Sequence, residues 1–405
     1  PNMGTGQAKR ALAALVGVVV LATVTACGEA KIKHPSKADL VSDATVDISP
    51  ASKRDDVPVS AEIEPGVKNG KLVELSLEKA GGKAVAGDLR ADESSWIPAK
   101  PLAWDTKYSA TVTAVDDVHR TVTKKSTFTT MKKPSKRIEP ILANEDGGTY
   151  GKAMPVALDF FDGAEVPEKK RAAVEKRLFV DSDPKQDGVW HWFSGNRLQY
   201  RPKDYWQPGT KISVRLGLKG MSLGDGAYGA RDMTAQFTID DTDREVSISN
   251  KKKELVATEN GEKVNSMPVS LGKPGYESYS GTMSIMERLP NTVFDTTNEP
   301  GCNGKEGGSD CYRTPVTHAE RLTWTGQFIH SAPWSVGDQG YRNVSHGCVN
   351  VSPGDAKWVY DFVRVGDPVT VTGTGVDLPA GDGYTAYDLG WKEFRAGSYL
   401  EQPSS

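Results

Sequence analysis

Two stretches of this sequence repeat one another at a constant offset along the chain. Residues 96–98 (WIP), 106–107 (TK) and Ser109 recur as residues 200–202 (YRP), 210–211 (TK) and Ser213. Each copy ends in a similar segment, STFT at 126–129 and AQFT at 235–238. Units of about 100 residues with many short alternating strands are typical of immunoglobulin-like sandwiches. The repeat therefore predicts two such sandwiches, over residues 46–132 and 133–242.

The chain is mainly β in character and too long for a single core. Its 405 residues exceed the size at which one hydrophobic core stops growing. Glycine (41) and proline (24) are plentiful, and short Val, Ile and Thr segments lie between turn residues throughout. Polar breaks at 132–134 and 240–243 predict the domain boundaries. The net charge of −3, with both signs interspersed, gives no support to a nucleic-acid partner, and we expect none.

A different pattern begins near Arg244 and predicts a β-rich third domain over residues 243–373. Strands are expected at 246–248 and 254–257, followed by an Asn260-Gly261 hairpin turn and a strand toward Leu271. A further strand is expected from Thr323 to His330. Residues 374–405 are interpreted as a C-terminal extension that packs on this domain.

One short helix is predicted after Cys348. Ser352 can cap it, Pro353 suits its first position, and Asp355 favours its positive end. Gly366 is expected to end the helix. Its apolar residues repeat at helical spacing, at Trp358, Val359, Phe362 and Val363.

The first residues predict an exported, lipid-anchored protein. Lys9-Arg10 precedes an uncharged run over 11–26 that meets Cys27, and a run this short suits a signal peptide better than a membrane span. Residues 24–27 (VTAC) resemble the lipobox of bacterial lipoproteins, in which the cysteine sulfur receives diacylglycerol. We expect a signal peptide over 1–26 and a polar tether over 27–45. The alternative is an ordinary signal peptide followed by a free cysteine.

Three cysteines remain when Cys27 is assigned to lipid. Outside the cytoplasm, paired cysteines oxidise and an odd one needs a reason. Cys302 and Cys311 bracket a short flexible loop and are the expected disulfide. A bridge from either of them to Cys348 is the alternative. Otherwise Cys348 is a free thiol, which is a liability unless the protein uses it.

The segment 345–350 (SHGCVN) combines several features of a nucleophilic site. A helix N-terminus and the neighbouring His346 are expected to lower the pKa of the Cys348 thiol. The amides of Gly347 and Cys348 could point at a developing oxyanion. Asn350 offers a donor and an acceptor that could orient a substrate.

His330 is the expected partner of the thiol. It lies at the end of a predicted strand and shares a face with Phe328. A Cys–His pair from two strand ends is the arrangement that thiol acyl transfer needs. An oxygen of Ser331 or Ser345 is expected to orient the imidazole, because no carboxylate lies nearby in sequence.

Other readings of these residues stay open. Cys348 could be an inert buried thiol, or it could bind zinc with His330 and His346. The usual zinc-ligand spacing is absent, so we expect no metal and no cofactor. Trp334 and Tyr341 suit a pocket wall or core. The remaining histidines are interpreted as surface or structural residues: His34, His119, His191 and His318.

These motifs resemble the L,D-transpeptidase catalytic domain family. The resemblance rests on residues 330–337 (HSAPWSVG) and 345–350 (SHGCVN), and it extends to Ser352-Pro353, Trp391 and residues 394–397 (FRAG). The whole chain resembles actinobacterial lipoprotein members with two immunoglobulin-like domains before the catalytic one. Many members have Thr-Pro-x-Gly where this chain has SYSG at 278–281. The flap before His330 is also enlarged here.

The resemblance implies a reaction. Cys348 would attack the carbonyl of diaminopimelate, the third residue of a peptidoglycan tetrapeptide stem, and expel D-alanine. The side-chain amine of a second stem would then attack the thioester and form a 3→3 cross-link, and carbapenems would acylate the same thiol. The protein would be tethered to the outer face of the cell membrane through Cys27 and reach into the cell wall.

The resemblance also implies roles for individual residues. His330 would be the general base, His346 a supporting residue, and the Gly347 and Cys348 amides the oxyanion hole. Substrate-binding roles are expected for Ser331, Asn350, Tyr312, Trp334 and Ser345. Three rival functions remain: an L,D-carboxypeptidase that hydrolyses the same thioester, a sortase-like enzyme, and a non-catalytic wall-binding lipoprotein.

Overall fold

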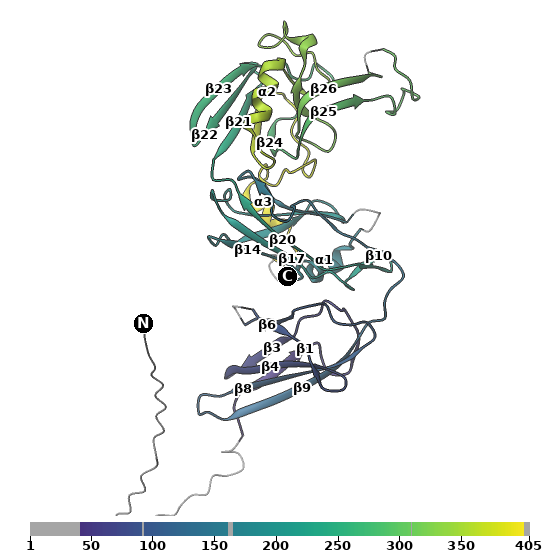
Figure 1. Cartoon of the computed structure of the whole chain (residues 1–405), viewed down its shortest axis with the longest axis vertical. Helices are drawn as coiled ribbons and strands as arrows, with labels where there is room; N and C mark the ends of the chain where they lie inside the picture. The colour runs from purple at the N-terminus through teal and green to yellow at the C-terminus, as the bar shows by residue number, and fades with distance from the viewer. Residues whose placement is uncertain (1–40, 91–92, 161–164, 309, 401–405) are drawn as a thin grey trace, which may run out of the picture.

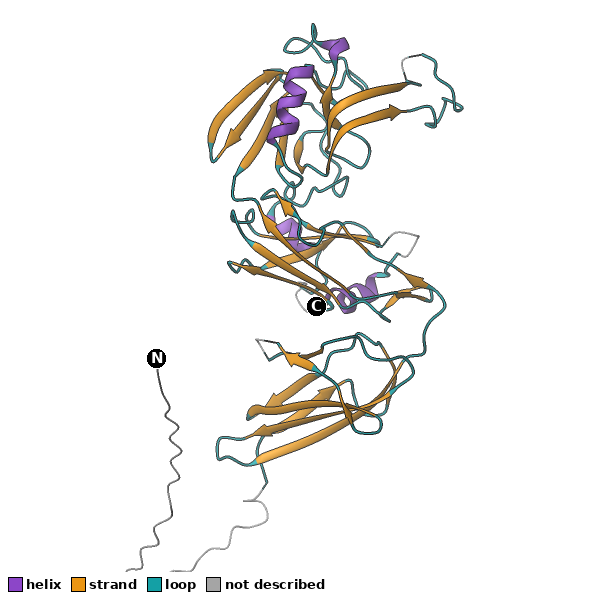
Figure 2. Ribbon diagram, viewed as in Figure 1, coloured by secondary structure: helices purple, strands orange, loops and turns teal. Residues whose placement is uncertain are grey.

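The structure is a computed structural model that describes residues 41–90, 93–160, 165–308 and 310–400. The described chain forms three β-rich units that follow one another along the long axis of the molecule (Figures 1 and 2). The predicted signal peptide, Cys27 and most of the tether lie outside the described residues. No helix among the described residues is long and apolar enough to cross a membrane.

The first unit is built on a five-stranded sheet in the order β2-β9-β8-β4-β5, accompanied by the pairs β1-β3 and β6-β7. Residues alternate between core and solvent along its central strand β8, as expected for a strand with one buried face. Its strands are β1 (Thr45–Ser49), β2 (Arg54–Val57), β3 (Glu64–Lys68), β4 (Lys71–Lys79), β5 (Lys83–Ala84), β6 (Gly87–Leu89), β7 (Trp96–Pro98), β8 (Lys107–Val115) and β9 (Thr121–Thr130).

The second unit packs two four-stranded sheets, β11-β13-β16-β15 and β12-β20-β17-β14, around one core, with a small sheet β10-β19-β18. It also contains a helix, α1 (Glu168–Glu175), that we did not predict. Its strands are β10 (Arg137–Ile138), β11 (Ile141–Leu142), β12 (Thr149–Tyr150), β13 (Val156–Asp159), β14 (Leu178–Asp183), β15 (Gly188–Trp192), β16 (Arg197–Pro202), β17 (Lys211–Leu216), β18 (Ser222–Gly224), β19 (Ala227–Gly229) and β20 (Met233–Ile239).

The sequence repeat corresponds to equivalent strand pairs in these two units. Lys107 lies opposite Thr129 in the first unit, and Lys211 lies opposite Thr238 in the second. Likewise, a glycine faces the repeated proline in both, as Gly87↔Pro98 and Gly188↔Pro202. The repeated residues therefore occupy equivalent positions in two related sandwiches.

A buried carboxylate joins the two sandwiches. Glu62 of the first unit accepts a hydrogen bond from Ser95 Oγ at 2.5 Å and lies between arginines of both units. Arg215 of the second unit is 2.9 Å from its Oε1, and Arg177 is 3.7 Å away. Burial alone would raise the pKa of Glu62, but Ser95 and the arginines outweigh it and lower that pKa. The carboxylate therefore stays charged at the junction.

The third unit contains two sheets, β23-β22-β21-β29-β24 and β25-β26-β27-β28, with α2 packed between them on an apolar core. The Asn260-Gly261 turn is confirmed: both residues have positive φ and join β22 to β23. Its elements are β21 (Arg244–Ser249), β22 (Glu254–Glu259), β23 (Glu262–Pro268), β24 (Gly281–Ser284), β25 (Glu287–Asp295), β26 (Arg313–Arg321), β27 (Phe328–Ser331), η2 (Pro333–Ser335), β28 (Val349–Val351), α2 (Pro353–Phe362), β29 (Pro368–Thr372) and α3 (Trp391–Ala396).

The predicted helix is confirmed, but its end and the strand before the site differ from expectation. Ser352 caps α2 by accepting a hydrogen bond from the Asp355 amide at 3.2 Å. α2 ends at Phe362 rather than at Gly366, because the cap residue Val363 is already extended. The strand expected from Thr323 to His330 is wrong over its first half, since residues 322–327 form a turn between β26 and β27.

The C-terminal extension contacts the second sandwich as well as the catalytic domain on which we expected it to pack. Arg201, within the sequence repeat, donates to the carbonyl oxygens of Ala386 and Leu389, both at 2.8 Å. The ring of His191 stacks on Phe394 of α3 at 4.9 Å. On its other side the extension bridges to β24. This segment therefore ties the second and third units together.

Candidate active site

His330 lies on β27, and Cys348 lies directly before the neighbouring strand β28 of the same sheet. β27 and β28 run parallel, with Ile329 opposite Val349 and His330 opposite Asn350. Side chains alternate between the faces of a strand. Cys348, two residues before Asn350, therefore shares a face with Asn350 and His330. The fold brings the predicted Cys–His pair onto one face of the sheet.

The Cys348 thiol is protonated at rest. Its Sγ donates to the carbonyl oxygen of Gly326 at 3.7 Å. The residue as a whole is half-buried, but its neighbours enclose the sulfur, and this burial raises the pKa of the thiol to about 11. The Phe328 backbone and the Arg321 cation act in the opposite direction and offset only part of the burial effect.

The expectation of a lowered thiol pKa is therefore wrong for this resting structure. α2 begins at Pro353, on the far side of β28, and the effect of a helix terminus fades within one turn. The neighbouring imidazole does not supply a cation either. Burial, and then the charge of Lys273, lower the pKa of His346 and favour its neutral ring.

The His330 imidazole is held with one nitrogen ready to accept a proton. Its Nδ1 lies 2.9 Å from the Ser331 carbonyl oxygen, which can only accept, so Nδ1 carries the hydrogen. This carbonyl is the orienting oxygen that we expected from Ser331 or Ser345. Burial lowers the pKa of His330 to about 4, so its Nε2 is unprotonated near neutral pH. The ring also meets Phe294 edge-on at 4.9 Å.

Asn350 lies beside His330 and away from solvent. Its side chain is buried, and its Nδ2 donates to Ser335 Oγ at 3.0 Å. Contact with Asn350 favours the charged form of His330, although burial outweighs it. The structure thus places Asn350 beside His330, and its substrate-binding role stays a prediction.

The turn before Cys348 is closed by side-chain hydroxyls. Ser345 Oγ accepts from the Gly347 amide at 3.1 Å and donates to the Cys348 carbonyl at 2.6 Å. Ser278 Oγ donates to the Gly347 carbonyl at 2.7 Å. Gly347 has a φ of 119°, which side-chain-bearing residues rarely adopt. The Gly347 amide is thus hydrogen-bonded within the turn, and Ser345 is buried there. The oxyanion and substrate roles expected for these two residues stay predictions.

His346 links this turn to the long loop between β25 and β26. Its Nε2 lies 2.9 Å from Lys273 Nζ and 3.3 Å from Asp310 Oδ1. The predicted disulfide is confirmed: Cys302 and Cys311 are bonded at 2.08 Å, directly beside Asp310, and Cys348 is free. The disulfide-bearing loop therefore contacts His346, two residues before Cys348.

Two aromatic residues, Tyr312 and Trp334, border the site, and their substrate-binding roles stay predictions. Tyr312 lies 5.6 Å from the His346 ring, and burial, followed by the proximity of Cys348, raises its pKa. Trp334 is 57% exposed and lies 5.9 Å from the His330 ring. The side chain of Ser331 is buried, and its backbone carbonyl accepts the hydrogen bond from His330. Tyr341 is 84% exposed and is neither wall nor core.

Sequence reasoning missed several residues that shape this site. Ser278 and Gly326 are distant from Cys348 in sequence, and no local pattern marks them. Ser335 could have been found, because it lies within the motif that begins at His330 and carries a hydroxyl. Arg321 is the last residue of β26, and its positive charge acts to lower the pKa of the Cys348 thiol.

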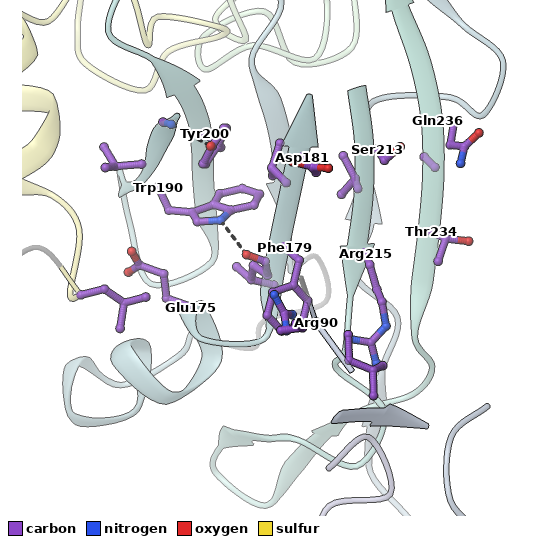
Figure 3. Close-up of a pocket in the computed structure, with 18 of the residues that line it drawn as sticks. Arg90, Glu175, Phe179, Asp181, Trp190, Tyr200, Ser213, Arg215, Thr234 and Gln236 are labelled. Atoms are coloured by element: carbon purple, nitrogen blue, oxygen red, sulfur yellow. Dashed lines mark hydrogen bonds between the residues drawn. The ribbon is translucent and has the colours of Figure 1, made fainter. Parts of the chain in front are cut away.

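A large hollow elsewhere in the molecule is not the site of this chemistry. It measures about 940 Å³ and lies beside β14 in the second sandwich (Figure 3). Phe179 lines it, with the Arg90 guanidinium of the first sandwich stacked 3.5 Å from the ring centre. Trp190, also in the wall, donates to the Leu178 carbonyl at 3.2 Å. Within the described residues, no three or more His, Cys, Asp or Glu side chains gather to hold a metal ion.

Comparisons with protein families match both parts of the chain. Residues 54–222 match the family described as bacterial Ig domain, and residues 243–371 match the L,D-transpeptidase catalytic domain. The first match agrees with the predicted immunoglobulin-like class of the sandwiches. The second covers β21 to β29 and includes Cys348 and His330.

Known L,D-transpeptidases are similar to all or part of the chain. "L,D-transpeptidase 2" of Mycobacterium tuberculosis is 33% identical over 98% of this chain and 97% of its own length. "L,D-transpeptidase 5" of the same organism is 31% identical over 88% of this chain and 77% of its own length. A solved structure of the L,D-transpeptidase LdtMt1 in complex with imipenem is 32% identical. It covers 59% of this chain and 100% of its own, with a TM-score of 0.48.

Proposed function

Because this chain belongs to the L,D-transpeptidase family, we propose that Cys348 is its nucleophile and His330 its general base in peptidoglycan cross-linking. The observation that carries the proposal is the parallel pairing of β27 and β28, which sets His330 opposite Asn350, with Cys348 directly before β28. The Ser331 carbonyl holds the imidazole so that Nε2 accepts the proton. Cys348, His330 and the Ser331 carbonyl would then serve as nucleophile, base and orienting group.

In the acylation step, Cys348 Sγ attacks the carbonyl carbon of the third residue of a donor stem. Its proton passes to His330 Nε2, and negative charge develops on the carbonyl oxygen. Collapse of this tetrahedral intermediate breaks the peptide bond to D-alanine, whose amine takes the proton from His330. The products are a thioester on Cys348 and free D-alanine.

In the second step, the side-chain amine of an acceptor stem attacks the thioester carbonyl. The amine loses its proton to His330, and the thiolate leaves and is reprotonated. A 3→3 amide cross-link forms and the enzyme is restored. Because the resting thiol has a pKa of about 11 and His330 one of about 4, the proton moves only as the carbon–sulfur bond forms.

Carbapenems are proposed to acylate the same thiol. A β-lactam presents a strained amide carbonyl to the nucleophile, and ring opening leaves the drug attached as a thioester. Imipenem is the molecule bound to the relative LdtMt1. Trp334, which is exposed beside His330, is available to border such a ligand.

We also place the protein outside the cytoplasm, anchored by lipid at Cys27. The support is the uncharged run before Cys27 and the lipobox-like residues 24–27. The Cys302–Cys311 disulfide is the second support, because disulfides persist in oxidising compartments. The two sandwiches would then raise the catalytic domain from the membrane toward the wall.

Intact-protein mass spectrometry after incubation with imipenem tests the nucleophile. The native protein should gain one drug mass, and Cys348→Ala should gain none while keeping its circular dichroism spectrum. Cys302 and Cys311 serve as internal controls, because the disulfide should remain unmodified. An adduct on the alanine variant would show that another residue is acylated.

A further inference from the structure

Three side chains form a row across the catalytic face of the sheet. Arg321 of β26 lies directly opposite Phe328 of β27. Phe328 precedes Ile329, which is opposite Val349, so Phe328 lies alongside Cys348. Phe328 and Cys348 also belong to one apolar cluster. The row therefore runs from a guanidinium, across an aromatic ring, to the thiol.

The Arg321 charge reaches the reacting sulfur. Its guanidinium lies over the Phe328 ring, 4.5 Å from the ring centre. Burial raises the pKa of the thiol, and Arg321 is the charged side chain that acts against that effect. Lys273, on the other side of the turn, is instead engaged with His346. Arg321 is thus the cation whose charge acts on the Cys348 thiol.

The present partners of Arg321 hold it weakly. Its Nε lies 3.4 Å from a carboxylate oxygen of Glu287, and its Nη1 lies 3.4 Å from the Thr323 carbonyl oxygen. Both distances are at the long limit for hydrogen bonds. The Glu287 side chain is half exposed, and such surface pairs contribute little stability. A carboxylate that arrives with a ligand can therefore compete for the guanidinium, whose fork suits two-point binding.

We propose that Arg321 binds the terminal carboxylate of the residue that leaves the donor stem. This inference rests on the proposed function, in which that residue is D-alanine. Its carboxylate lies one residue from the attacked carbonyl, or about 3.5 Å of extended chain. A stem with one more residue presents a neutral amide at that position. Arg321 would thus select donors that end one residue beyond the attacked bond.

Two donors that differ in a single group test this selection. A tetrapeptide stem ending in D-alanine is compared with the same stem ending in D-alaninamide, and the rate of thioester formation is followed by intact mass. Wild-type protein should favour the carboxylate donor by roughly 10- to 100-fold, the usual strength of charge-assisted hydrogen bonds. Arg321→Gln should lose this preference by slowing the carboxylate donor much more than the amide donor, because loss of the charge at the thiol affects both donors alike. Arg321→Lys should keep part of the preference.

Arg313→Gln is the matched control, because Arg313 lies on the same strand and pairs with Asp295 at 3.1 Å. It should preserve the wild-type preference. The proposal is overturned if wild-type protein accepts both donors equally, or if Arg321→Gln slows both donors by the same factor. Failure of the proposed function gives a different result: neither donor would acylate the wild-type protein, and the role of Arg321 would fall with it.

Discussion

One face of the sheet β25-β26-β27-β28 carries Cys348, His330 and Asn350, whereas the opposite face turns Ile329, Val349 and Val351 toward α2. On the first face, polar side chains are held in fixed orientations by backbone carbonyls and hydroxyls. On the second, apolar side chains fill a core. Alternation along two short strands thus separates reactivity from stability, although the two sets of residues are adjacent in sequence.

The face that packs against α2 also carries polar residues, among them Glu320. It lies opposite Arg288, and both its carboxylate oxygens are buried without a hydrogen-bond partner among the described residues. Burial raises its pKa to about 9, and the charge of Arg288 offsets only part of that effect. Glu320 is therefore a protonated acid in the core near neutral pH, remote in role from the Cys–His pair.

The largest effect is expected on the reactive face. His330→Ala should slow thioester formation about 10²- to 10⁴-fold, because it removes the positioned base. His119→Ala, at a turn of the first sandwich, is the control and should change the rate less than twofold. If His346→Ala were far more damaging than His330→Ala, the roles of the two histidines would be reversed.

The pH dependence of kcat/KM should also report the protonation state of His330. His330 acts as a base only when Nε2 is unprotonated, and its pKa lies at about 4. The acid limb of kcat/KM should therefore fall near pH 4 rather than near the ordinary histidine value of about 6.5. An acid limb near 6.5 that is lost in His330→Ala would contradict the buried, neutral imidazole.

A substitution on the face that packs against α2 should lower stability and leave activity nearly unchanged, which is the reverse of the effect of His330→Ala. Val359 of α2 is fully buried in the core, so Val359→Ala should lower the free energy of unfolding by about 2 kcal/mol. Thioester formation by the folded protein should stay within about twofold of wild type. Lys357→Ala, exposed on the same helix, should change stability by less than about 0.5 kcal/mol. An equal loss from both variants would show that α2 stabilises the sheet through something other than apolar packing.

The smallest effect on activity is expected from Glu320→Gln, which acts on stability alone. The folded state keeps the Glu320 proton up to a pKa of about 9, whereas an unfolded glutamate loses it near about 4.3. Folding therefore binds a proton in this window, and wild-type stability should decrease as pH rises from 5 to 9. Glutamine cannot ionise, so the Tm of the variant should exceed that of wild type increasingly toward pH 9, with unchanged activity. A Tm difference independent of pH would contradict the buried acid.

Much of the fold could be read from the sequence because its signals are local. The Ser352 cap, the Asn260-Gly261 turn and the Cys302–Cys311 bridge each depend on residues close together in the chain. The repeat needs only the comparison of two segments. The pair of Cys348 and His330 was also predicted, since each lies in a recognisable motif at a strand end.

Contacts between distant segments decided the rest. The raised pKa of the Cys348 thiol follows from burial. The Gly347 amide donates to Ser345 within the turn, and Ser278, which is remote in sequence, donates to the Gly347 carbonyl. The C-terminal extension meets Arg201, far earlier in the chain. Sequence alone determined which groups could react and where helices and turns begin, because those depend on residue type and near neighbours. Their protonation, orientation and partners depend on which remote residues surround them, and only the tertiary structure supplies those.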